Sequence, residues 1–397
     1  MSRNTPKKAV HFGAGKIGSG LVAWLLYNSG YEIVFTEVNN KTINRLNTQK
    51  SYRVIEVGQD GTSETVVTNY RAINSETHEE DLIREIATAD LVTCAVLPHV
   101  LEQIAPFIAK GIDARSEQLT PLAVIACENA FGATDTLASF IKSPENTDPA
   151  RLDGYERRAR FANSIADRIV PTQDRSRSLD VRVEKFYEWV IDRTPFSDHA
   201  PPPIEGVRWV DNLEPFIERK LFTLNTAHAT AAYHGYVRRK ATVYDALQDR
   251  DIRAEVRRAL KETALLITHK HGIPVHEQHA YVEKIVRRIA NPFLEDAVER
   301  VGRAPLRKLG RKERFIGPAA DLAQMGADFR GLLDAAEMAF RFQRVEGDEE
   351  SFRLAEIMGA HGPEEVVQRV CGLSPSDMLF PAVVEVVRRV QADMVAN

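Results

Sequence analysis

The feature of this sequence that most constrains its fold is a glycine-rich turn that directly follows a short apolar strand candidate. Residues 8–12 read KAVHF, and residues 13–18 read GAGKIG, which has the spacing GxGxxG. An apolar stretch of helical character, residues 21–26, comes next. Glycines at these positions permit a tight turn, a close approach of the backbone to a diphosphate, and close packing of helix on strand. The pattern predicts the opening βαβ unit of a dinucleotide-binding domain.

A carboxylate follows the next strand candidate at the spacing that such a domain uses. Residues 32–35 form the strand candidate, and Glu37 lies about 20 residues after the glycines. A carboxylate there can accept both ribose hydroxyls of adenosine and repels a 2′-phosphate, which favours NAD over NADP. The alternative is a surface acid at a strand end. The residues expected to bind the cofactor are Gly13, Gly15, Lys16, Ile17, Gly18, Glu37, Val96 and Asn129.

Two further strand candidates of the buried type, residues 91–96 and 122–127, each follow a helical pattern, as repeated βα units require. In an open α/β sheet the carboxyl ends of the strands face the ligand. Asn129 is therefore a candidate oxyanion donor, and Glu128 is a candidate proton carrier. Taken singly, either residue is more typical of a turn or a helix cap.

Other segments of the first half predict additional strands. Residues 52–57 and 65–70, joined by a glycine-containing turn, predict an inserted β-hairpin. Residues 181–190 predict a last strand. The apolar stretch 161–171 contains two charged residues, Asp167 and Arg168. They form either a buried pair that holds two elements together, or Asp167 contacts the substrate.

The second half of the chain has a helical pattern. The proline-rich stretch 194–204 is unsuited to the interior of an element and predicts a linker. Beyond it, apolar residues recur at spacings of three and four with charged opposite faces. The clearest such segments are residues 253–269, 276–290, 332–341 and 352–358. We predict an α/β Rossmann-type domain with an inserted hairpin at 1–196 and a mainly α-helical substrate domain at 197–397.

Composition excludes several classes of protein. A net charge of -4 on 397 residues argues against a general nucleic-acid binder. No apolar run approaches the roughly 20 residues of a membrane span, and we expect no signal peptide. The cysteines and histidines show no metal-ligand spacing, so we expect no metal. Three dispersed cysteines fit a reduced, cytoplasmic compartment.

One apolar helical segment carries residues suited to oxidising an alcohol. The stretch 218–228 reads ERKLFTLNTAH and spaces Lys220, Asn225 and His228 so that all three can project into one cleft. A metal-independent alcohol dehydrogenase needs a base for the hydroxyl proton and donors for the developing alkoxide. Lysine, with an ordinary pKa of about 10.4, needs desolvation or a cationic neighbour to work as that base. On spacing alone, an exposed lysine with a packed asparagine and histidine is the more common interpretation.

A basic segment lies further along, at residues 299–318, and reads ERVGRAPLRKLGRKERFIGP. Its glycines and prolines indicate loops rather than one continuous helix. Guanidinium groups suit phosphate, so in an acidic protein this segment favours a small anionic substrate over nucleic acid. The alternative is a basic surface patch.

Taken together, these stretches resemble the polyol-specific long-chain dehydrogenases, in particular their fungal mannitol-1-phosphate 5-dehydrogenase branch. The resemblance covers nearly the whole chain. It rests on VHFGAGKIG, VTCAVLP, VIACENA, DRIVP, ERKLFTLNTAHA, NPFLEDAVERVGRAPLRKLGRKERFIGPA and FQRVEGDEES. It implies that D-mannitol 1-phosphate and NAD⁺ are interconverted with D-fructose 6-phosphate and NADH, and a monomer is compatible with it.

The resemblance also implies roles for individual residues. Lys220 matches the family's general base, and Asn129 and Asn225 match its oxyanion hole. His228 matches a residue that positions substrate or base, and Glu128 one that relays the proton to solvent. Residues matching Asp167, Arg300 and Lys308 contact sugar hydroxyls in related enzymes. For the phosphate we favour Arg303 over Arg307 and Arg311.

Three positions depart from the family pattern. Lys16 replaces an asparagine and Ser19 an arginine in the glycine turn, and Leu97 replaces a glycine in the family's CAVGPN. A glycine there can serve close backbone approach or a positive φ. These departures bear on cofactor affinity and leave open a non-catalytic NAD(H)-binding protein. A second alternative is a related long-chain dehydrogenase that acts on an unphosphorylated polyol or uronate, and the basic segment argues against it.

Overall fold

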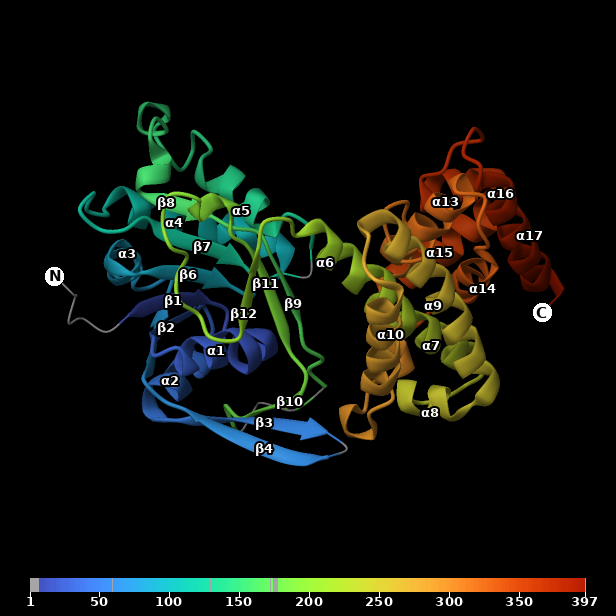
Figure 1. Cartoon of the computed structure of the whole chain (residues 1–397), viewed down its shortest axis with the longest axis horizontal. Helices are drawn as coiled ribbons and strands as arrows, with labels where there is room; N and C mark the ends of the chain where they lie inside the picture. Colours follow the sequence, from blue (N-terminus) through green and yellow to red (C-terminus); the bar gives the residue numbers. More distant parts are fainter. Residues whose placement is uncertain (1–6, 59, 129, 172, 174–177, 397) are drawn as a thin grey trace. The chain divides into compact units, whose positions relative to one another are not determined.

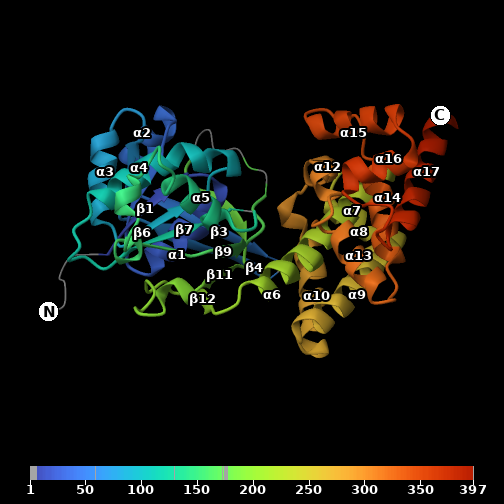
Figure 2. The same ribbon diagram turned by 90° about the horizontal axis from the view of Figure 1, so that it is seen from above.

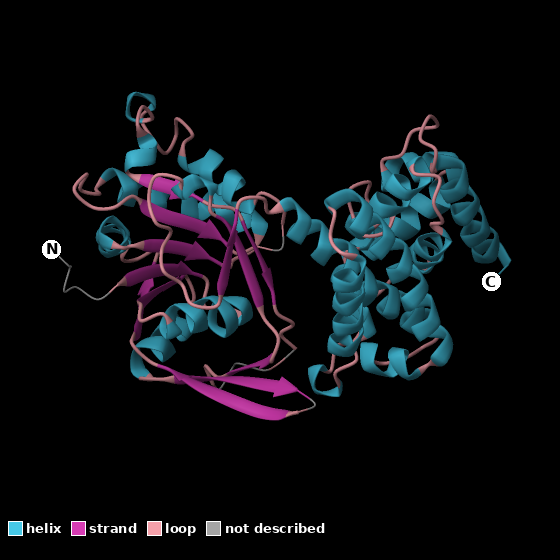
Figure 3. Ribbon diagram, viewed as in Figure 1, coloured by secondary structure: helices cyan, strands magenta, loops and turns pink. Residues whose placement is uncertain are grey.

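The structure, a computed structural model, describes residues 7–396 except 59, 129, 172 and 174–177 (Figure 1). The chain divides into two compact units, Met1–Phe216 and Ile217–Asn397. Strands lie in unit 1, whereas unit 2 is built of helices (Figure 3). The predicted fold class, a Rossmann-type domain followed by a mainly helical domain, is confirmed.

Unit 1 contains a six-stranded sheet in the order β5-β2-β1-β6-β7-β8, and every neighbouring pair is parallel. Its strands are β1 (Lys8–Phe12), β2 (Glu32–Glu37), β5 (Tyr70–Asn74), β6 (Leu91–Cys94), β7 (Leu122–Ala126) and β8 (Ala159–Phe161). From β1 the chain proceeds first to β2 on one side and later to β6 on the other. The carboxyl ends of β1 and β6 therefore flank the switch point at which sheets of this type bind ligands.

Helices and small sheets cover both faces of this sheet. Alternate residues of a strand point to opposite faces, so Val10 packs with α3, α4 and α5, and Ala9 packs with α1 and α2. Figure 2 shows α3, α4 and α5 along one face. The helices are α1 (Ala23–Asn28), α2 (Asn40–Thr48), α3 (Glu79–Thr88), α4 (Leu101–Asp113) and α5 (Ala133–Ile141).

Two three-stranded sheets, in the orders β10-β3-β4 and β12-β11-β9, complete unit 1. Their strands are β3 (Tyr52–Gly58), β4 (Gly61–Val67), β9 (Ser164–Asp167), β10 (Val181–Glu184), β11 (Glu188–Asp192) and β12 (Val207–Val210). The predicted hairpin exists, but its second strand ends at Val67. Asn69 has a φ of 56°, which redirects the chain so that Tyr70 starts β5 of the main sheet.

The prediction of one strand over residues 181–190 is wrong. Two strands, β10 and β11, occupy this stretch and belong to different sheets. An alternating pattern gives the face of each residue but not the sheet that a strand joins. The proline-rich stretch contributes Phe196 and Ile204 to the core of unit 1.

Unit 2 is organised around α7 (Thr226–Val237), which packs against α8, α9, α11 and α14. The other helices are α6 (Glu214–Arg219), α8 (Val243–Gln248), α9 (Arg250–His271), α10 (Val275–Ile289), α11 (Val298–Gly302), α12 (Pro305–Lys308), α13 (Ile316–Gln324), α14 (Arg330–Phe340), α15 (Glu349–Ala360), α16 (Pro363–Val366) and α17 (Phe380–Ala396). The four predicted helices correspond to α9, α10, α14 and α15. Within the described residues, no helix is long and apolar enough to span a membrane.

Candidate active site

The glycine turn that follows β1 is closed by packing at two positions and open at the third. Gly13 has a φ of 94°, and a methyl group there would lie 2.7 Å from the carbonyl oxygen of Ala95. A methyl group on Gly18 would lie 2.1 Å from the carbonyl oxygen of Gly13. At Gly15, by contrast, it would meet no heavy atom of a non-neighbouring residue within 4 Å. The turn thus leaves its backbone accessible at Gly15, as a bound diphosphate requires.

Glu37 lies at the end of β2 and reaches the glycine turn. Its Oε1 accepts a hydrogen bond of 2.6 Å from the backbone N–H of Ala14. Oε2 has no partner among the described residues and can accept from a hydroxyl. The residue therefore joins the turn to the site where a ribose would be recognised.

The three departures from the family pattern are compatible with the turn. The Ser19 hydroxyl is buried and donates to the carbonyl of Ala14 at 3.0 Å, which ties the turn to the following helix. Leu97 has a φ of -103°, so this position does not demand glycine, and its side chain is 61% exposed. Lys16 is partly buried at the start of the helix.

Glu128 follows β7 at the same carboxyl edge. Its Oε1 accepts a hydrogen bond of 2.7 Å from the backbone N–H of Val96, which follows β6. Burial raises the pKa of Glu128 to about 7, although this hydrogen bond opposes the shift. A carboxyl group with such a pKa exchanges protons readily at neutral pH. Asn129, the predicted oxyanion donor, lies outside the described residues.

Asp167 and Arg168 both have buried side chains. Asp167 ends β9, where it pairs with Glu188 of β11 in the sheet. The guanidinium of Arg168 contacts Glu56 of β3 at 2.5 Å, donates to the carbonyl of Gly20 at 2.9 Å, and lies 4.5 Å from the Trp24 ring. Arg168 therefore links β3 to the helix that follows the glycine turn.

In unit 2, the predicted catalytic segment forms a π-helical turn, η6 (Lys220–Asn225), that continues into α7. A π-helix bonds residue i to residue i+5 and so brings Lys220 and Asn225 to one side, whereas α-helical geometry would set them about 140° apart. From position 220 to 230, only Lys220, Asn225 and His228 are partly exposed, and the other residues are buried. We call these three residues the Lys220 stripe.

The wider turn frees carbonyl groups that need other donors. The Thr226 hydroxyl lies 3.2 Å from the carbonyl oxygen of Leu221 and 2.9 Å from that of Arg314. The guanidinium of Arg314 donates to the carbonyl of Asn225 at 3.5 Å. These contacts to the segment before α13 hold the π-helical turn, and no sequence pattern indicates it.

His228 faces a buried carboxylate that sequence reasoning missed. Its Nε2 lies 3.1 Å from Oδ2 of Asp296, whose side chain is 4% exposed. The other oxygen of Asp296 accepts from the guanidinium of Arg300, which is four residues later in the sequence and lies in α11. Burial alone would raise the pKa of Asp296, but His228 and Arg300 outweigh it and lower that pKa below its ordinary value. Asp296 lies in the loop before α11, and its spacing of four residues from Arg300 was the available signal.

The basic segment forms short helices and loops, as predicted. Lys308 is buried, donates to the carbonyl of Val301, and has a pKa well below its ordinary value because of burial and the nearby Arg314 and Arg307. Its ammonium group thus has one partner in the protein interior, and the sugar contact expected of Lys308 stays a prediction.

The arginines of the segment differ in their pairing. Ion pairs join Arg307 and Arg314 to Glu313 at 3.0 and 3.1 Å, and Arg311 to Asp321 at 3.9 Å. Arg303 and Lys312 are exposed and have no acidic partner in the described part of the chain. Of the three arginines considered for a phosphate, only Arg303 therefore has no ion-pair partner among the described residues.

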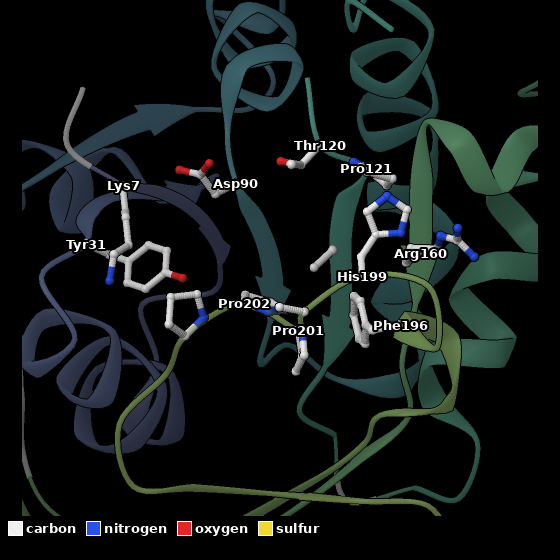
Figure 4. A pocket seen from close by; sticks show the side chains of 13 residues that line it. Lys7, Tyr31, Asp90, Thr120, Pro121, Arg160, Phe196, His199, Pro201 and Pro202 are labelled. Carbon is white, nitrogen blue, oxygen red and sulfur yellow. The ribbon is translucent and has the colours of Figure 1, made fainter. Parts of the chain in front are cut away.

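A separate cavity of about 430 Å³ lies at the amino ends of the strands in unit 1, opposite the glycine turn (Figure 4). Its wall includes Tyr31, Asp90, Pro121, Phe196, Pro201 and Pro202. None of the predicted site residues lines it. Among the described residues, no group of three or more histidine, cysteine, aspartate or glutamate side chains is arranged to hold a metal ion.

Comparison with known proteins identifies the family. Residues 7–206 match the mannitol dehydrogenase Rossmann domain, and residues 212–371 match the mannitol dehydrogenase C-terminal domain. The chain belongs to the mannitol dehydrogenase family. Among its relatives in this family, the mannitol-1-phosphate 5-dehydrogenase of Chaetomium globosum is 72% identical over 393 residues, which cover 99% of each chain. That of Aspergillus niger is 57% identical over 385 residues, which cover 97% of this chain and 98% of the relative.

Two solved dehydrogenase structures share the fold. The ternary complex of Pseudomonas fluorescens mannitol 2-dehydrogenase with NAD and D-mannitol has a TM-score of 0.75 at 17% identity and covers 99% of this chain and 92% of that one. A substrate-free D-sorbitol dehydrogenase has a TM-score of 0.76 at 17% identity, with coverages of 97% and 91%. The resemblance inferred from the sequence motifs is confirmed.

Proposed function

We propose that this protein is an NAD-dependent enzyme that interconverts D-mannitol 1-phosphate and D-fructose 6-phosphate, with Lys220 as the general acid and base. The observation that carries the catalytic assignment is the Lys220 stripe, because an amine, an amide and an imidazole are the only partly exposed groups on an otherwise buried stretch. The full-length likeness to mannitol-1-phosphate 5-dehydrogenases at 57–72% identity supports the substrate.

The residues of the glycine turn fit NAD. Backbone N–H groups near the open Gly15 suit the diphosphate, and Glu37 suits the adenosine ribose. We assign cofactor contacts also to Gly13, Lys16, Ile17, Gly18 and Val96, and to Asn129, which lies outside the described residues. When bound, NAD supplies the hydride acceptor.

The chain's own groups handle the proton and the developing charge. In the oxidative direction neutral Lys220 takes the proton of the C5 hydroxyl, and in the reductive direction its ammonium returns it. The side-chain amide of Asn225 donates to the oxygen as negative charge develops there, a role that Asn129 shares in this proposal. Glu128, with a pKa of about 7, exchanges protons with solvent.

We assign the phosphate to Arg303. A guanidinium forms charge-assisted, bidentate hydrogen bonds with a phosphate, and Arg303 is exposed without an acidic partner among the described residues. Arg303→Ala should raise the KM for mannitol 1-phosphate about 10- to 100-fold, since such bonds are worth about 1.5–3 kcal/mol. Lys312→Ala, which removes another exposed cation of the same basic segment, is the matched control. Equal effects of the two changes would contradict the assignment.

Steady-state absorbance of NADH tests the function itself. Purified protein should consume NADH with fructose 6-phosphate, and mannitol 1-phosphate should be oxidised far faster than free mannitol. The reverse preference would favour a dehydrogenase of unphosphorylated polyols, and binding of NADH without turnover would favour a non-catalytic protein. Activity should also survive a strong chelator.

Lys220→Ala tests the mechanism. Loss of general acid–base catalysis should lower kcat by about 10²- to 10⁴-fold and leave NADH binding, followed by its fluorescence, within twofold. Lys312→Ala again serves as control. A loss in kcat smaller than tenfold would refute the role of Lys220.

We further propose a cytoplasmic location and action on a diffusing small molecule rather than on nucleic acid or membrane. Three buried, unpaired cysteines and a net charge of -4 support this. Every group assigned above comes from one chain, so a monomer suffices for the chemistry.

A further inference from the structure

We infer that Asp296 is a positioning residue: it holds the imidazole of His228 with its proton on Nε2, so that Nδ1 accepts a hydrogen bond from a substrate hydroxyl. The tautomer follows from the structure of unit 2 alone. The role of Nδ1 rests on the proposed function.

Nε2 of His228 and the carboxylate of Asp296 face each other. His228 Nε2 and Asp296 Oδ2 lie 3.1 Å apart, both atoms are buried, and neither has another hydrogen-bond partner among the described residues. A buried polar atom without a partner costs about 1–3 kcal/mol, so a small rotation of the ring that completes this bond is favoured.

The second partner of Asp296 fixes which atom carries the proton. The guanidinium of Arg300 binds Oδ1 and cannot give up its charge, which keeps the carboxylate ionised. An ionised carboxylate only accepts hydrogen bonds, so the nitrogen that faces it must carry a proton. In the neutral ring the proton is then on Nε2, and Nδ1 has the lone pair.

The opposite edge of the ring is the one that a substrate can reach. The side chain of His228 is 18% exposed, although Nε2 itself is buried, and Nδ1 has no hydrogen-bond partner in the described part of the chain. Because His228 belongs to the Lys220 stripe, this acceptor is on the same partly exposed side of the segment as the proposed base. A hydroxyl can donate to it, whereas a carbonyl oxygen cannot. We therefore assign it to a hydroxyl next to the reacting carbon, which it orients.

Asp296→Asn tests this arrangement because it keeps the shape but removes the charge. Long-range ¹H–¹⁵N correlation spectra of protein labelled at histidine, with the signal of His228 assigned by its loss in His228→Gln, report the tautomer directly. We expect Nε2–H in the native protein and a population of Nδ1–H in Asp296→Asn. Glu299→Gln, which removes the charge of an exposed carboxylate three residues further along the chain, should leave the spectrum unchanged.

Kinetics provide the second readout. Partners that orient a metal-binding histidine typically contribute about 10- to 100-fold, and by analogy kcat with fructose 6-phosphate should fall by about that factor in Asp296→Asn. The dissociation constant of NADH should not change, and Asp296→Glu should partly restore kcat. If Asp296→Asn does not fold by circular dichroism, Arg300→Gln, which removes the other partner of the carboxylate, replaces it in the tautomer measurement and should likewise populate Nδ1–H. Its kcat is not compared, because Arg300 itself matches a substrate contact of the family.

Two results would overturn the inference: a native His228 with its proton on Nδ1, or a tautomer that is the same in the native protein and in the variant. Neither depends on turnover. A protein that fails to reduce fructose 6-phosphate but shows the expected tautomers would therefore refute the proposed function and leave the role of Asp296 intact.

Discussion

Replacing Glu128 by glutamine should make unit 1 more stable at neutral and alkaline pH. The carboxyl group lies buried beyond β7 and accepts a hydrogen bond from the backbone N–H of Val96. Burial raises its pKa from about 4.5 to about 7. Glutamine has nearly the same shape and retains an oxygen that accepts from Val96, but it has no charge to bury.

The size of the effect follows from the two pKa values. The unfolded chain releases this proton near pH 4.5, whereas the folded protein retains it until about pH 7. Between these values the folded state binds more protons, so the free energy of unfolding falls as pH rises. At 1.36 kcal/mol per pH unit the total loss is about 3 kcal/mol, complete by about pH 8. The glutamine variant should lack this loss.

Urea unfolding at pH 5 and pH 8, followed by tryptophan fluorescence, measures the difference. All three tryptophans, Trp24, Trp189 and Trp209, lie in unit 1, so the signal reports that unit. Between the two pH values the native protein should lose about 2.5 kcal/mol more than Glu128→Gln. Glu102→Gln, at an exposed acid in the first turn of α4, is the control.

An identical pH dependence of the native protein and Glu128→Gln would refute the reasoning, because the carboxyl group would then titrate alike in folded and unfolded chains. The same variant bears on the proposed proton exchange. If Glu128 relays the proton, the more stable variant should also have a lower kcat near neutral pH. A stable and fully active Glu128→Gln variant would show that the raised pKa of Glu128 plays no part in catalysis.

Two further predictions concern the glycine turn. Gly18→Ala should destabilise unit 1 by about 1–3 kcal/mol or more, because the added methyl would lie 2.1 Å from the Gly13 carbonyl oxygen. Gly15→Ala, by contrast, should leave stability nearly unchanged and weaken NADH binding. Thermal unfolding and NADH fluorescence titration distinguish the two, and equal destabilisation would contradict the open backbone at Gly15. Glu37→Ala should raise the KM for NAD at least several-fold and lower the preference for NAD over NADP, because a ribose acceptor and a bond to Ala14 are lost. Kinetics with both cofactors measure this, and an unchanged preference would remove Glu37 from cofactor recognition.

Local patterns in the sequence determined many of the secondary-structure elements of this protein. The glycine spacing, the buried-type strands and Glu37 are signals that arise within short windows, because turn geometry and strand burial depend on neighbouring residues. They predicted β1, β2, β6 and β7 and the edge of the sheet that carries Glu128. The apolar periodicity likewise predicted α9 and α10 to within a few residues.

Contacts between segments that are distant in the sequence determined the features that local patterns did not predict. The π-helical turn that aligns Lys220 with Asn225 is held by Thr226 and by Arg314, about 90 residues away in the chain. The assignment of β10 and β11 to different sheets depends on their partners, which an alternating pattern does not specify.

The candidate site shows the same division. The residue types of the Lys220 stripe indicated alcohol chemistry from the sequence, since side-chain chemistry is fixed by residue identity. Only the folded unit brought Asp296 within 3.1 Å of His228 and buried Lys308 among its neighbours. Distance and burial are properties of packing, and they decide which charged group is paired, which is shielded and which remains available to a ligand.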